Sequence, residues 1–213
     1  RLLLDSRDKY RGLHGMPYLG RRFSGNGDIR GFWDLNEKHS DFTQGLPSKG
    51  SVCLRGDDSP KIAIGRNNMP SVASYPFPNF IRNRLKRGLV VSGAGSDAMD
   101  GIVSLHRKRF TIQFKPENSP IYQNIYETMK EIERLSGRKV YASSRPSTVH
   151  PMGGACLGHD IQNSVIDASG QVHDIPGLYI VDATAFPAPI ATAPTMSIAA
   201  WAENVASRFV KGG

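Results

Sequence analysis

One histidine of this sequence lies in a segment with almost no side-chain bulk. His150 is followed by a proline and a run of small residues in the stretch Thr148–Gly158, TVHPMGGACLG. Glycine leaves the main chain uncovered, so another group, such as a flat ligand, can approach it closely. An imidazole facing that ligand could take or give a proton near neutral pH. The alternative is a histidine that completes a turn by a hydrogen bond to the main chain.

A second glycine-rich stretch has the form of a nucleotide-binding motif in the wrong context. Gly93–Ala98, GAGSDA, fits the GxGxxG/A pattern and follows the strand-like residues GLVV. In a dinucleotide-binding unit this pattern opens a helix, whose N-terminus faces the pyrophosphate. Here Met99 and Asp100 follow, and then another strand-like stretch, GIVSL. The sequence therefore predicts a turn between two strands.

The composition is that of an ordinary globular chain with an excess of positive charge. The 213 residues carry a formal net charge of +8, and no apolar run approaches the roughly 20 residues of a membrane span. The densest basic cluster, Arg82–Arg87, lacks the interleaved aromatics or reader motif that would indicate nucleic-acid binding. A solvated basic face is the favoured interpretation, and an acidic substrate or an anionic membrane surface stays open. Cys53 and Cys156 have no metal-type spacing and are interpreted as two small buried residues.

The middle of the chain alternates short apolar runs with turn residues. Between residues 48 and 114 the runs rich in Val and Ile are SVCLR, KIAIG, GLVVSG, GIVSL and RFTIQF. Strands linked so tightly predict an antiparallel sheet, because parallel pairing needs long crossovers. The proline-rich stretch 67–80 is too long for a hairpin and is predicted to form a lid or wall.

Helical periodicity marks both ends of the chain and one stretch between them. Ser119–Gly137 offers a capping serine, Pro120 at the first helical position and one apolar face, so a helix ending at Gly137 is predicted. Residues 1–8, RLLLDSRD, are interpreted as the middle of an amphipathic helix. A last helix is predicted after Pro194, with an apolar face formed by Ile198, Trp201 or Ala202, Val205 and Phe209.

Segments of the C-terminal quarter resemble the closing segments of the glucose–methanol–choline (GMC) oxidoreductases. They read TVHPMGGACLGHD, VIDASGQVHDIPGLYIVDATAFPAP and APTMSIAAWAENVASRF. Their order, spacing and residue types agree with a His-Pro-x-Gly box, a Val-x-Asp strand pair, a Gly-Leu-Tyr-x-x-Asp strand and a helix led by proline. The likeness is strongest to the cholesterol-oxidase-like branch of these FAD flavoenzymes, which FSGNGD in the first third also fits. It is close for residues 147–210 and looser for the sheet region.

The resemblance implies a mixed α+β and α/β fold, the C-terminal portion of a two-domain GMC flavoprotein. An antiparallel sheet in residues 16–146 would form the substrate-binding domain. Residues 1–15 and 147–213 would supply a segment, the closing strands and the last helix of the FAD-binding domain. The family's glycine-rich ADP-binding unit has no counterpart here. FAD would therefore be bound together with an N-terminal FAD-binding half, which would be a separate chain, a cleaved piece or an omitted portion.

The resemblance assigns the proton transfer to His150. This residue matches the family histidine that faces the flavin and takes the proton of the substrate hydroxyl. Such a base is needed because removal of a hydride from an alcohol carbon leaves a developing cationic centre, so the hydroxyl proton must leave at about the same moment. Met152 and Gly153 match main chain that lies close to the cofactor.

Two further segments are implied to bind the cofactor. Asp182 and Ala183 match a strand end beside the ribityl–pyrophosphate region of FAD, although an aspartate at a strand end is otherwise usually a cap. Ala193, Pro194 and Thr195 match the start of the last helix. The N–H groups and partial positive charge there would stabilise the flavin when reduction makes it anionic.

The chain departs from the family in the loop before the last helix. The family usually has a second polar group there, His or Asn, where this chain has Ala193 or, with a shift of one residue, Thr192. Neither side chain can act as a base. Asn26 in FSGNGD could take over the contact, the pair could be dispensable for this substrate, or the flavin could serve a lyase or isomerase reaction.

The sequence thus favours an FAD-dependent oxidoreductase that takes a hydride from an alcohol CH–OH group, with His150 as the proton acceptor. Tyr75, Phe77 and Phe80 suggest a bulky or apolar small-molecule alcohol, although such residues are commonly core. Two alternatives stay open: a flavin-containing lyase or isomerase without net oxidation, and a non-catalytic half or subunit of a flavoprotein. Neither a nucleic-acid partner nor a membrane span is expected.

Overall fold

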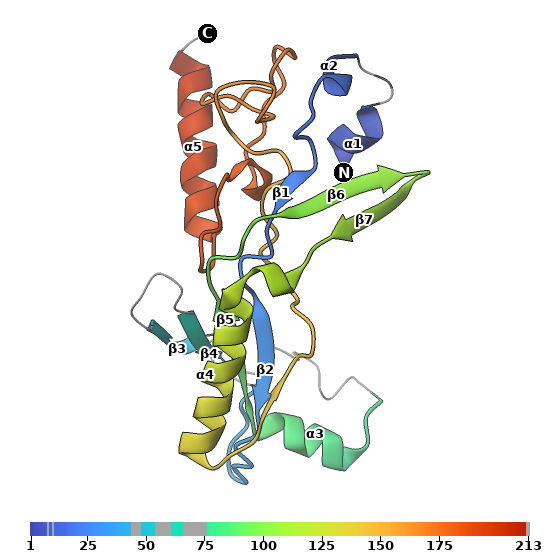
Figure 1. Cartoon of the computed structure of the whole chain (residues 1–213). Helices are drawn as coiled ribbons and strands as arrows, with labels where there is room; N and C mark the ends of the chain where they lie inside the picture. The colour runs from blue at the N-terminus through green and yellow to red at the C-terminus, as the bar shows by residue number, and fades with distance from the viewer. Residues whose placement is uncertain (8, 10, 44–47, 54–60, 66–75, 212–213) are drawn as a thin grey trace. The chain divides into compact units, whose positions relative to one another are not determined.

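The computed structural model describes residues 1–7, 9, 11–43, 48–53, 61–65 and 76–211 (Figure 1). The chain divides into two compact units. Unit 1 comprises Arg1–Asn26, Ser96–Asn118 and Val149–Gly213, and unit 2 comprises Gly27–Gly95 and Ser119–Thr148. Residues 96–118, within the range predicted to bind substrate, are thus packed in unit 1. The assignment of ranges 1–15, 16–146 and 147–213 to FAD and substrate stays a prediction, because compactness does not show which ligand a unit binds.

Unit 2 is built on an antiparallel sheet with the strand order β3-β4-β5-β2-β8. The strands are β2 (Ile29–Trp33), β3 (Ser48–Cys53), β4 (Lys61–Gly65), β5 (Leu89–Ala94) and β8 (Val140–Ala142). The apolar runs correctly predicted β3, β4 and β5 and their antiparallel pairing. Strands β2 and β8 were not predicted. The first has Arg30 and Gly31 next to each other in its middle, and the second is only three residues long.

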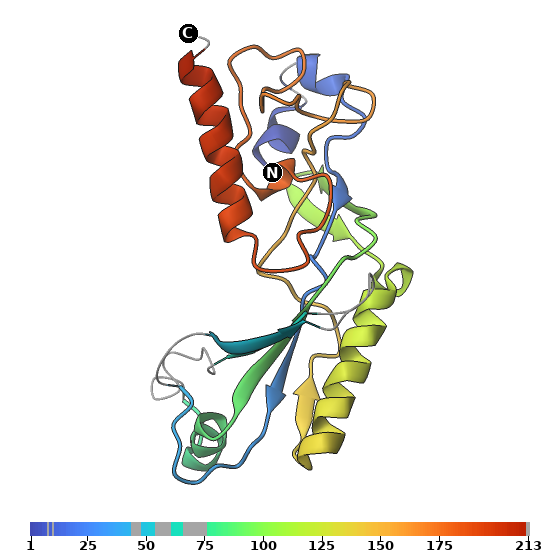
Figure 2. The same cartoon turned by 90° about the vertical axis from the view of Figure 1, so that its left-hand side faces the viewer.

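Helix α4 (Pro120–Ser136) lies along this sheet (Figure 2). Its predicted bounds are confirmed, because Ser119 is the N-cap residue and Gly137 ends the helix in the left-handed conformation at φ 62°. The Ser119 side chain makes no capping hydrogen bond, so the proline at the first turn is the stronger start signal. The buried face consists of Ile121, Tyr122, Ile125 and Met129.

The glycines of the GAGSDA stretch make room for α4. A Cβ placed on Gly93 would lie 2.4 Å from Ile125 Cγ2, and one placed on Gly95 would lie 2.3 Å from Ile121 Cγ1. No real Cβ approaches another carbon so closely, so each glycine accepts an isoleucine of the helix. Strand β5 ends at Ala94, and β6 begins at Gly101 with no helix between them. The predicted turn between strands is confirmed, and the glycine spacing reflects helix–sheet packing.

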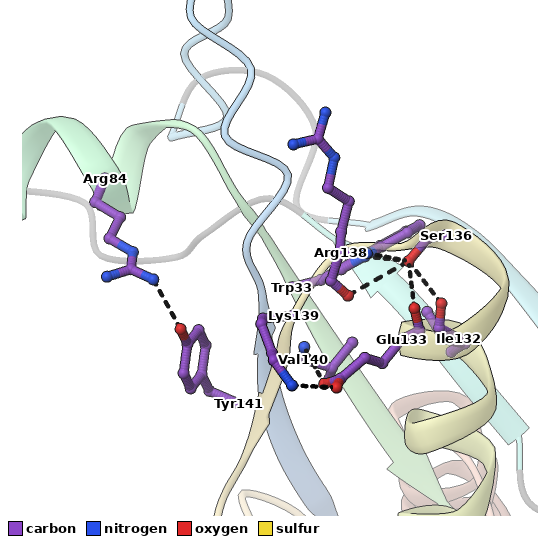
Figure 3. A network of polar contacts seen from close by, with 9 residues as sticks. All are labelled: Trp33, Arg84, Ile132, Glu133, Ser136, Arg138, Lys139, Val140 and Tyr141. Atoms are coloured by element: carbon purple, nitrogen blue, oxygen red, sulfur yellow. Dashed lines mark hydrogen bonds and ion pairs between the residues drawn. The ribbon is translucent and has the colours of Figure 1, made fainter.

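A polar network joins the C-terminal end of α4 to β8 and to α3 (Asn79–Lys86) (Figure 3). Glu133 accepts hydrogen bonds from Lys139 Nζ at 2.6 Å and from the Val140 N–H at 3.0 Å, which hold the pKa of its carboxyl below the ordinary value. Arg84 bonds Asp34 at 2.6 Å and the Tyr141 hydroxyl at 2.7 Å. The basic cluster Arg82–Arg87 therefore belongs to helix α3 and the residue after it, which charge counting alone did not predict.

Unit 1 contains a smaller antiparallel sheet with the order β1-β6-β7. Its strands are β1 (Arg21–Phe23), β6 (Gly101–His106) and β7 (Arg109–Gln113), of which the last two were predicted. Short helices α1 (Leu2–Ser6) and α2 (Arg11–His14) precede β1, and the 3-10 helix η1 (Pro116–Asn118) follows β7. The expected helix in RLLLDSRD is thus confirmed, although it is only five residues long. The core cluster is Leu4, Leu13, Met16, Leu19, Ala155, Val165, Ile166, Val172 and Ala185.

Helix α5 (Thr195–Lys211) is the predicted last helix, and it packs beside the turns of residues 157–180 (Figure 1). Val205 is buried, and Trp201 donates from Nε1 to the Ile180 carbonyl at 3.0 Å. Phe209 is mostly exposed but meets the Tyr179 ring edge-on at 5.6 Å. The helix is therefore fastened by three side chains on one face.

Residues 157–180 contain single bridges instead of the two short strands expected. The bridges join Leu157 to Ile166, Ile166 to Val172 and Gln171 to Tyr179. Turns at Asp167–Gly170 and Ile175–Leu178 reverse the chain before any strand can extend. Asp167 stabilises the first turn. Burial raises its pKa, but the Ser169 hydroxyl and the N–H groups of Ser169 and Gln171 outweigh this effect and lower it.

Some predicted features lie outside the described residues. These are Tyr75, most of the proline-rich stretch 67–80 and the side chain of Cys53. Phe77 and Phe80 are described and are exposed. Among the helices that the structure describes, none is both long and apolar enough to span a bilayer.

Candidate functional site

The segment after His150 is paired with the end of β1. Ser24 and Met152 exchange two main-chain hydrogen bonds, of 3.0 Å from Ser24 N and 3.1 Å from Met152 N. Gly154 N donates to Arg21 O at 3.0 Å. His150 is half-buried, whereas Met152 is fully buried. The main chain two residues beyond the imidazole is therefore fixed to a strand.

The other edge of the same segment is bonded to the 3-10 helix η2 (Ala183–Ala185). Gly153 N donates to Ala183 O at 3.1 Å, and Ala155 N donates to Thr184 O at 3.1 Å. Asp182 is the N-cap of η2, and its Oδ1 accepts from Thr184 N at 2.8 Å. The alternative that Asp182 is a cap is therefore what the structure shows. The proximity of Asp182 to the ribityl–pyrophosphate region of FAD, which the family resemblance implies, stays a prediction.

The two glycines of the segment are needed for different reasons. Gly153 has φ 76°, and a Cβ there would lie 1.8 Å from the Arg22 carbonyl oxygen. Gly154 has φ 90°, but a Cβ there would meet nothing closer than Gly20 Cα at 3.9 Å. The missing side chain of Gly153 thus leaves room for the main chain of Arg22. At Gly154 no protein atom fills the space where a side chain would lie.

A cavity of about 470 Å³ lies against this segment. Its volume is within the range of about 300–1,000 Å³ typical of small-molecule sites. Most of its lining is apolar or glycine, from Arg1–Leu4, Leu19, Gly20, Phe23, Val103, Phe110, Pro151–Ala155, Leu178–Asp182 and Thr184. Of the residues predicted from the sequence, Met152, Gly153 and Asp182 meet here, and Pro151 connects the cavity wall to His150.

Asn26 contacts the loop that precedes α5. Its side chain is 0% exposed, and its backbone has the left-handed φ of 57°. Asn26 Nδ2 donates to Thr192 O at 2.8 Å, and Asn26 Oδ1 accepts from Ala191 N at 2.8 Å. Ala193 and Thr195 are exposed, and Pro194 is buried. The Pro194 carbonyl accepts a hydrogen bond from Ile198 N, in the first turn of α5, at 2.9 Å. The structure brings Asn26 and this loop together.

Two residues that sequence reasoning missed support Asn26. Ser24 Oγ donates to Asp97 Oδ1 at 2.6 Å and accepts from Asn26 N at 2.9 Å. Asp97 Oδ2 accepts from Gly25 N at 2.8 Å, and both Ser24 and Asp97 are buried. The available signal was an aspartate in the GAGSDA turn, where it was considered only as part of a nucleotide motif.

Cys156, in the same segment as His150, is a buried free thiol. Burial raises its pKa, although the positive charge of Arg22 acts in the opposite direction. Its Sγ donates to the Phe186 carbonyl at 3.2 Å. The thiol is therefore held protonated as a core group and is unsuited to be a nucleophile. In the described part of the chain, no three His, Cys, Asp or Glu residues gather as metal ligands would.

The fold and this segment define a class. The chain has two antiparallel sheets, a closing helix and a His-Pro-x-Gly segment, and the sequence profile of GMC oxidoreductases matches residues 79–202. This match covers more than half of the chain. The chain therefore belongs to the GMC oxidoreductase family, as its C-terminal segments indicated.

Particular relatives agree with this assignment. Cholesterol oxidases from two strains of Mycobacterium tuberculosis, CDC 1551/Oshkosh and ATCC 25618/H37Rv, are each 43% identical over 68 residues, which is 32% of this chain and 12% of theirs. The crystal structure of pyridoxine 4-oxidase from Mesorbium loti is similar over 92% of this chain and 44% of its own, with a TM-score of 0.61 and 17% identity. The chain spans less than half the length of these proteins. The structural likeness confirms the predicted fold class, and the partial identity supports the likeness to cholesterol oxidase.

Proposed function

We propose that this chain acts in an FAD-dependent oxidoreductase that takes a hydride from an alcohol CH–OH group, with His150 accepting the hydroxyl proton. The main support is the segment Pro151–Ala155. It follows His150, is bonded to protein main chain on both edges, and lines an apolar cavity. Members of the GMC family are generally FAD-dependent oxidoreductases. His150 directly precedes Pro151 of the cavity lining, and an imidazole facing a bound alcohol there would suit removal of the hydroxyl proton.

The chain's residues fit part of an FAD molecule. The open side of Gly154 and the apolar cavity wall suit a flat ring, and Asp182 lies at the rim of the same wall. Met152, Gly153 and Ala183 would hold the cofactor mainly through their main chain, and Ala193–Thr195 would do so at the start of α5. When bound, FAD supplies the acceptor for the hydride.

This chain's own part in the reaction is to place the substrate hydroxyl and remove its proton. His150 accepts that proton, and the bonds between Met152 and Ser24 keep its main chain in place. Apolar residues around the cavity exclude water. Helix α5 presents the positive end of its dipole at Thr195, where negative charge that forms during the reaction is stabilised.

We propose that a partner, an N-terminal FAD-binding half, binds the nucleotide part of FAD. Within the described residues, Gly93 and Gly95 of the GxGxxG/A stretch accept isoleucines of α4, and no helix opens after them. They are therefore unsuited to bind a pyrophosphate. The resemblance to 44% of the length of pyridoxine 4-oxidase fits a chain that works together with a further FAD-binding segment.

A second candidate function keeps the flavin without net oxidation. It is favoured by Ala193 and Thr192, which stand where the family usually has His or Asn. It also gains support from Asn26, because both polar ends of its side chain bond the main chain of the loop. A flavin lyase or isomerase would need fewer groups around a substrate hydroxyl.

Anaerobic mixing of the protein and its N-terminal half with alcohols distinguishes these functions. Cholesterol and pyridoxine, which occur in the relatives' names, are suitable first probes beside a panel of primary and secondary alcohols. Loss of the yellow flavin absorbance on mixing is the expected result. A bound flavin that no alcohol reduces would favour the lyase or isomerase, and a purified assembly without flavin would favour a non-catalytic role.

A further inference from the structure

We infer that Asn26 is a positioning residue, which holds the loop before α5 in register with the His150 segment. This inference rests on the proposed function, because the two segments would border the same cofactor. The stretch Ser24–Asn26 contacts both of them. Its first residue pairs with Met152, and its last bonds Ala191 and Thr192.

Both polar atoms of the Asn26 amide bond the loop. The Ala191 N–H can only donate and the Thr192 carbonyl can only accept, so the two bonds fix the orientation of the amide. The Asn26 side chain is entirely buried, whereas Ala191 and Thr192 are half-buried, so leaving a polar atom of the amide unpaired would be costly. The amide is thus a clamp on main chain.

The clamp acts where the loop is strained. Ala191 has φ 58°, a left-handed conformation that is strained for a residue with a Cβ. Such a conformation persists only when its surroundings enforce it, and the N–H of this residue is the one that Asn26 Oδ1 accepts. Without the amide, Ala191 is expected to relax, and the loop leading to Pro194 would move.

The other end of the stretch is rigid. Asn26 N donates to Ser24 Oγ, which in turn donates to the buried carboxylate of Asp97. Gly25 N donates to the second oxygen of Asp97. Ser24 is held by Met152, two residues from His150. Three residues span at most about 10 Å, so the stretch fixes the loop and the histidine segment at short range.

The test variant is Asn26→Gly in the full-length protein that carries its N-terminal half. Glycine adopts φ 57° without strain, so this change removes the amide and leaves the backbone conformation accessible. The matched control is Asn36→Gly, which removes an exposed asparagine with φ 52° in unit 2. Both changes add the same backbone freedom to the unfolded chain, and only the first removes the clamp.

Asn26→Gly is expected to slow alcohol-driven flavin reduction by roughly tenfold to a hundredfold, because a displacement of about 1 Å can have an effect of this size. FAD content and KM should stay close to those of the unchanged protein. Hydrogen exchange at the Ala191 amide should speed up in Asn26→Gly and stay unchanged in Asn36→Gly. Asn26→Asp keeps the acceptor for Ala191 but loses the donor to Thr192, so it should retain protection of the Ala191 amide from exchange. Its rate of flavin reduction should lie between the rates of Asn26→Gly and Asn36→Gly.

Faster exchange at Ala191 with an unchanged flavin reduction rate would overturn the positioning role, as would unchanged exchange in Asn26→Gly. Loss of FAD or of folding in both Asn26→Gly and Asn26→Asp would show a purely structural residue and would also overturn it. If the unchanged protein reduces no flavin with any alcohol, the proposed function fails separately. The exchange comparison at Ala191 would then still show whether the clamp exists.

Discussion

The two units use glycine and regular structure in different ways. In unit 2, Gly93 on strand β5 and Gly95 just after it have no Cβ, so they leave room for isoleucine side chains of helix α4. In unit 1, Gly153 accepts a carbonyl oxygen of the main chain and needs a positive φ as well. The first arrangement depends on side-chain packing, which can adjust. The second depends on backbone contacts, which cannot move without displacing β1.

The proposed chemistry lies in unit 1, which has less regular structure than unit 2. The residues from 150 to 194 form few repeating hydrogen bonds and are held by single bridges, caps and main-chain contacts to β1 and η2. Residues brought in from several loops can face one site, whereas a sheet presents side chains at fixed spacing. We therefore expect substitutions in unit 2 to change stability, and substitutions in unit 1 to change stability and chemistry at separate positions.

The largest effect is expected for Gly153→Ala. The new Cβ would lie 1.8 Å from Arg22 O at a φ of 76°, so both strain and a backbone clash oppose folding. A loss of about 4 kcal/mol or more in the free energy of unfolding is expected, which is an exceptional value for one substitution. Gly154→Ala is the matched control. It has the strain without the clash and should cost about 1–3 kcal/mol.

Denaturant titration of the two variants measures this difference. Equal destabilisation by Gly153→Ala and Gly154→Ala would show that φ alone matters. The contrast between the main-chain packing of unit 1 and the side-chain packing of unit 2 would then disappear.

His150→Ala is expected to separate chemistry from stability within unit 1. Removing the proton acceptor should lower the rate of flavin reduction by roughly a hundredfold or more, because general-base catalysis contributes about 10²–10⁴-fold. FAD content and thermal stability should change little, since His150 is half-buried at the edge of the segment. Rapid anaerobic mixing with an alcohol gives the rate.

His159→Ala, which changes an exposed histidine just after the segment Thr148–Gly158, is the control. It should reduce flavin at the normal rate. Normal kinetics in His150→Ala would remove this histidine from the mechanism.

Gly93→Ala tests whether the packing of unit 2 can adjust. The new Cβ would lie 2.4 Å from Ile125 Cγ2, and overpacking of this kind costs about 1–3 kcal/mol. Ile125→Ala alone should cost about 2–5 kcal/mol because Ile125 is fully buried. In the double variant the clash is absent, so adding Gly93→Ala to Ile125→Ala should cost almost nothing. Strictly additive losses in denaturant titrations would refute this contact, and flavin reduction should be unaffected in all three.

The sequence predicted those elements whose partners lie in a repeating pattern. Ile121, Ile125 and Met129 recur at helical spacing, so α4 could be placed to within one residue. Strand β2 escaped prediction because its stability comes from pairing with β5 and β8 more than from its own residues, which include Arg30 and Gly31. Helix α3 escaped it because a basic run such as RNRLKR is typical of any solvated face.

The sequence predicted which residues belong to the candidate site, but it did not predict which contacts they make. His150, Met152, Gly153 and Asp182 were chosen from a motif, and the structure places the last three around one cavity. Asn26 was chosen as a polar residue near a missing partner, but its bonds reach Ala191 and Thr192, 165 and 166 residues away. No local pattern encodes a contact over such a separation, and none indicated the buried bond between Ser24 and Asp97.

The smallest effect concerns the pH dependence that Cys156 gives to unit 1. Burial raises the pKa of this thiol in the folded protein above its ordinary value of 9.0, despite the positive charge of Arg22. As pH rises through the ordinary value, the unfolded chain releases the thiol proton while the folded chain keeps it. The unfolded state then binds fewer protons, so the free energy of unfolding decreases with rising pH. The contribution is complete below the ordinary pKa and is lost above it.

Cys156→Ala should therefore have a shallower decline in stability than the unchanged protein between about pH 8 and about pH 10, a range that spans the ordinary thiol pKa. Other groups, Cys53 included, titrate in both proteins and cancel in the comparison. Urea midpoints at a series of pH values measure the two slopes. Parallel slopes would mean that the thiol titrates alike in the folded and unfolded states. The segment after His150 would then be open to solvent at Cys156, against the close main-chain packing that sets unit 1 apart from unit 2.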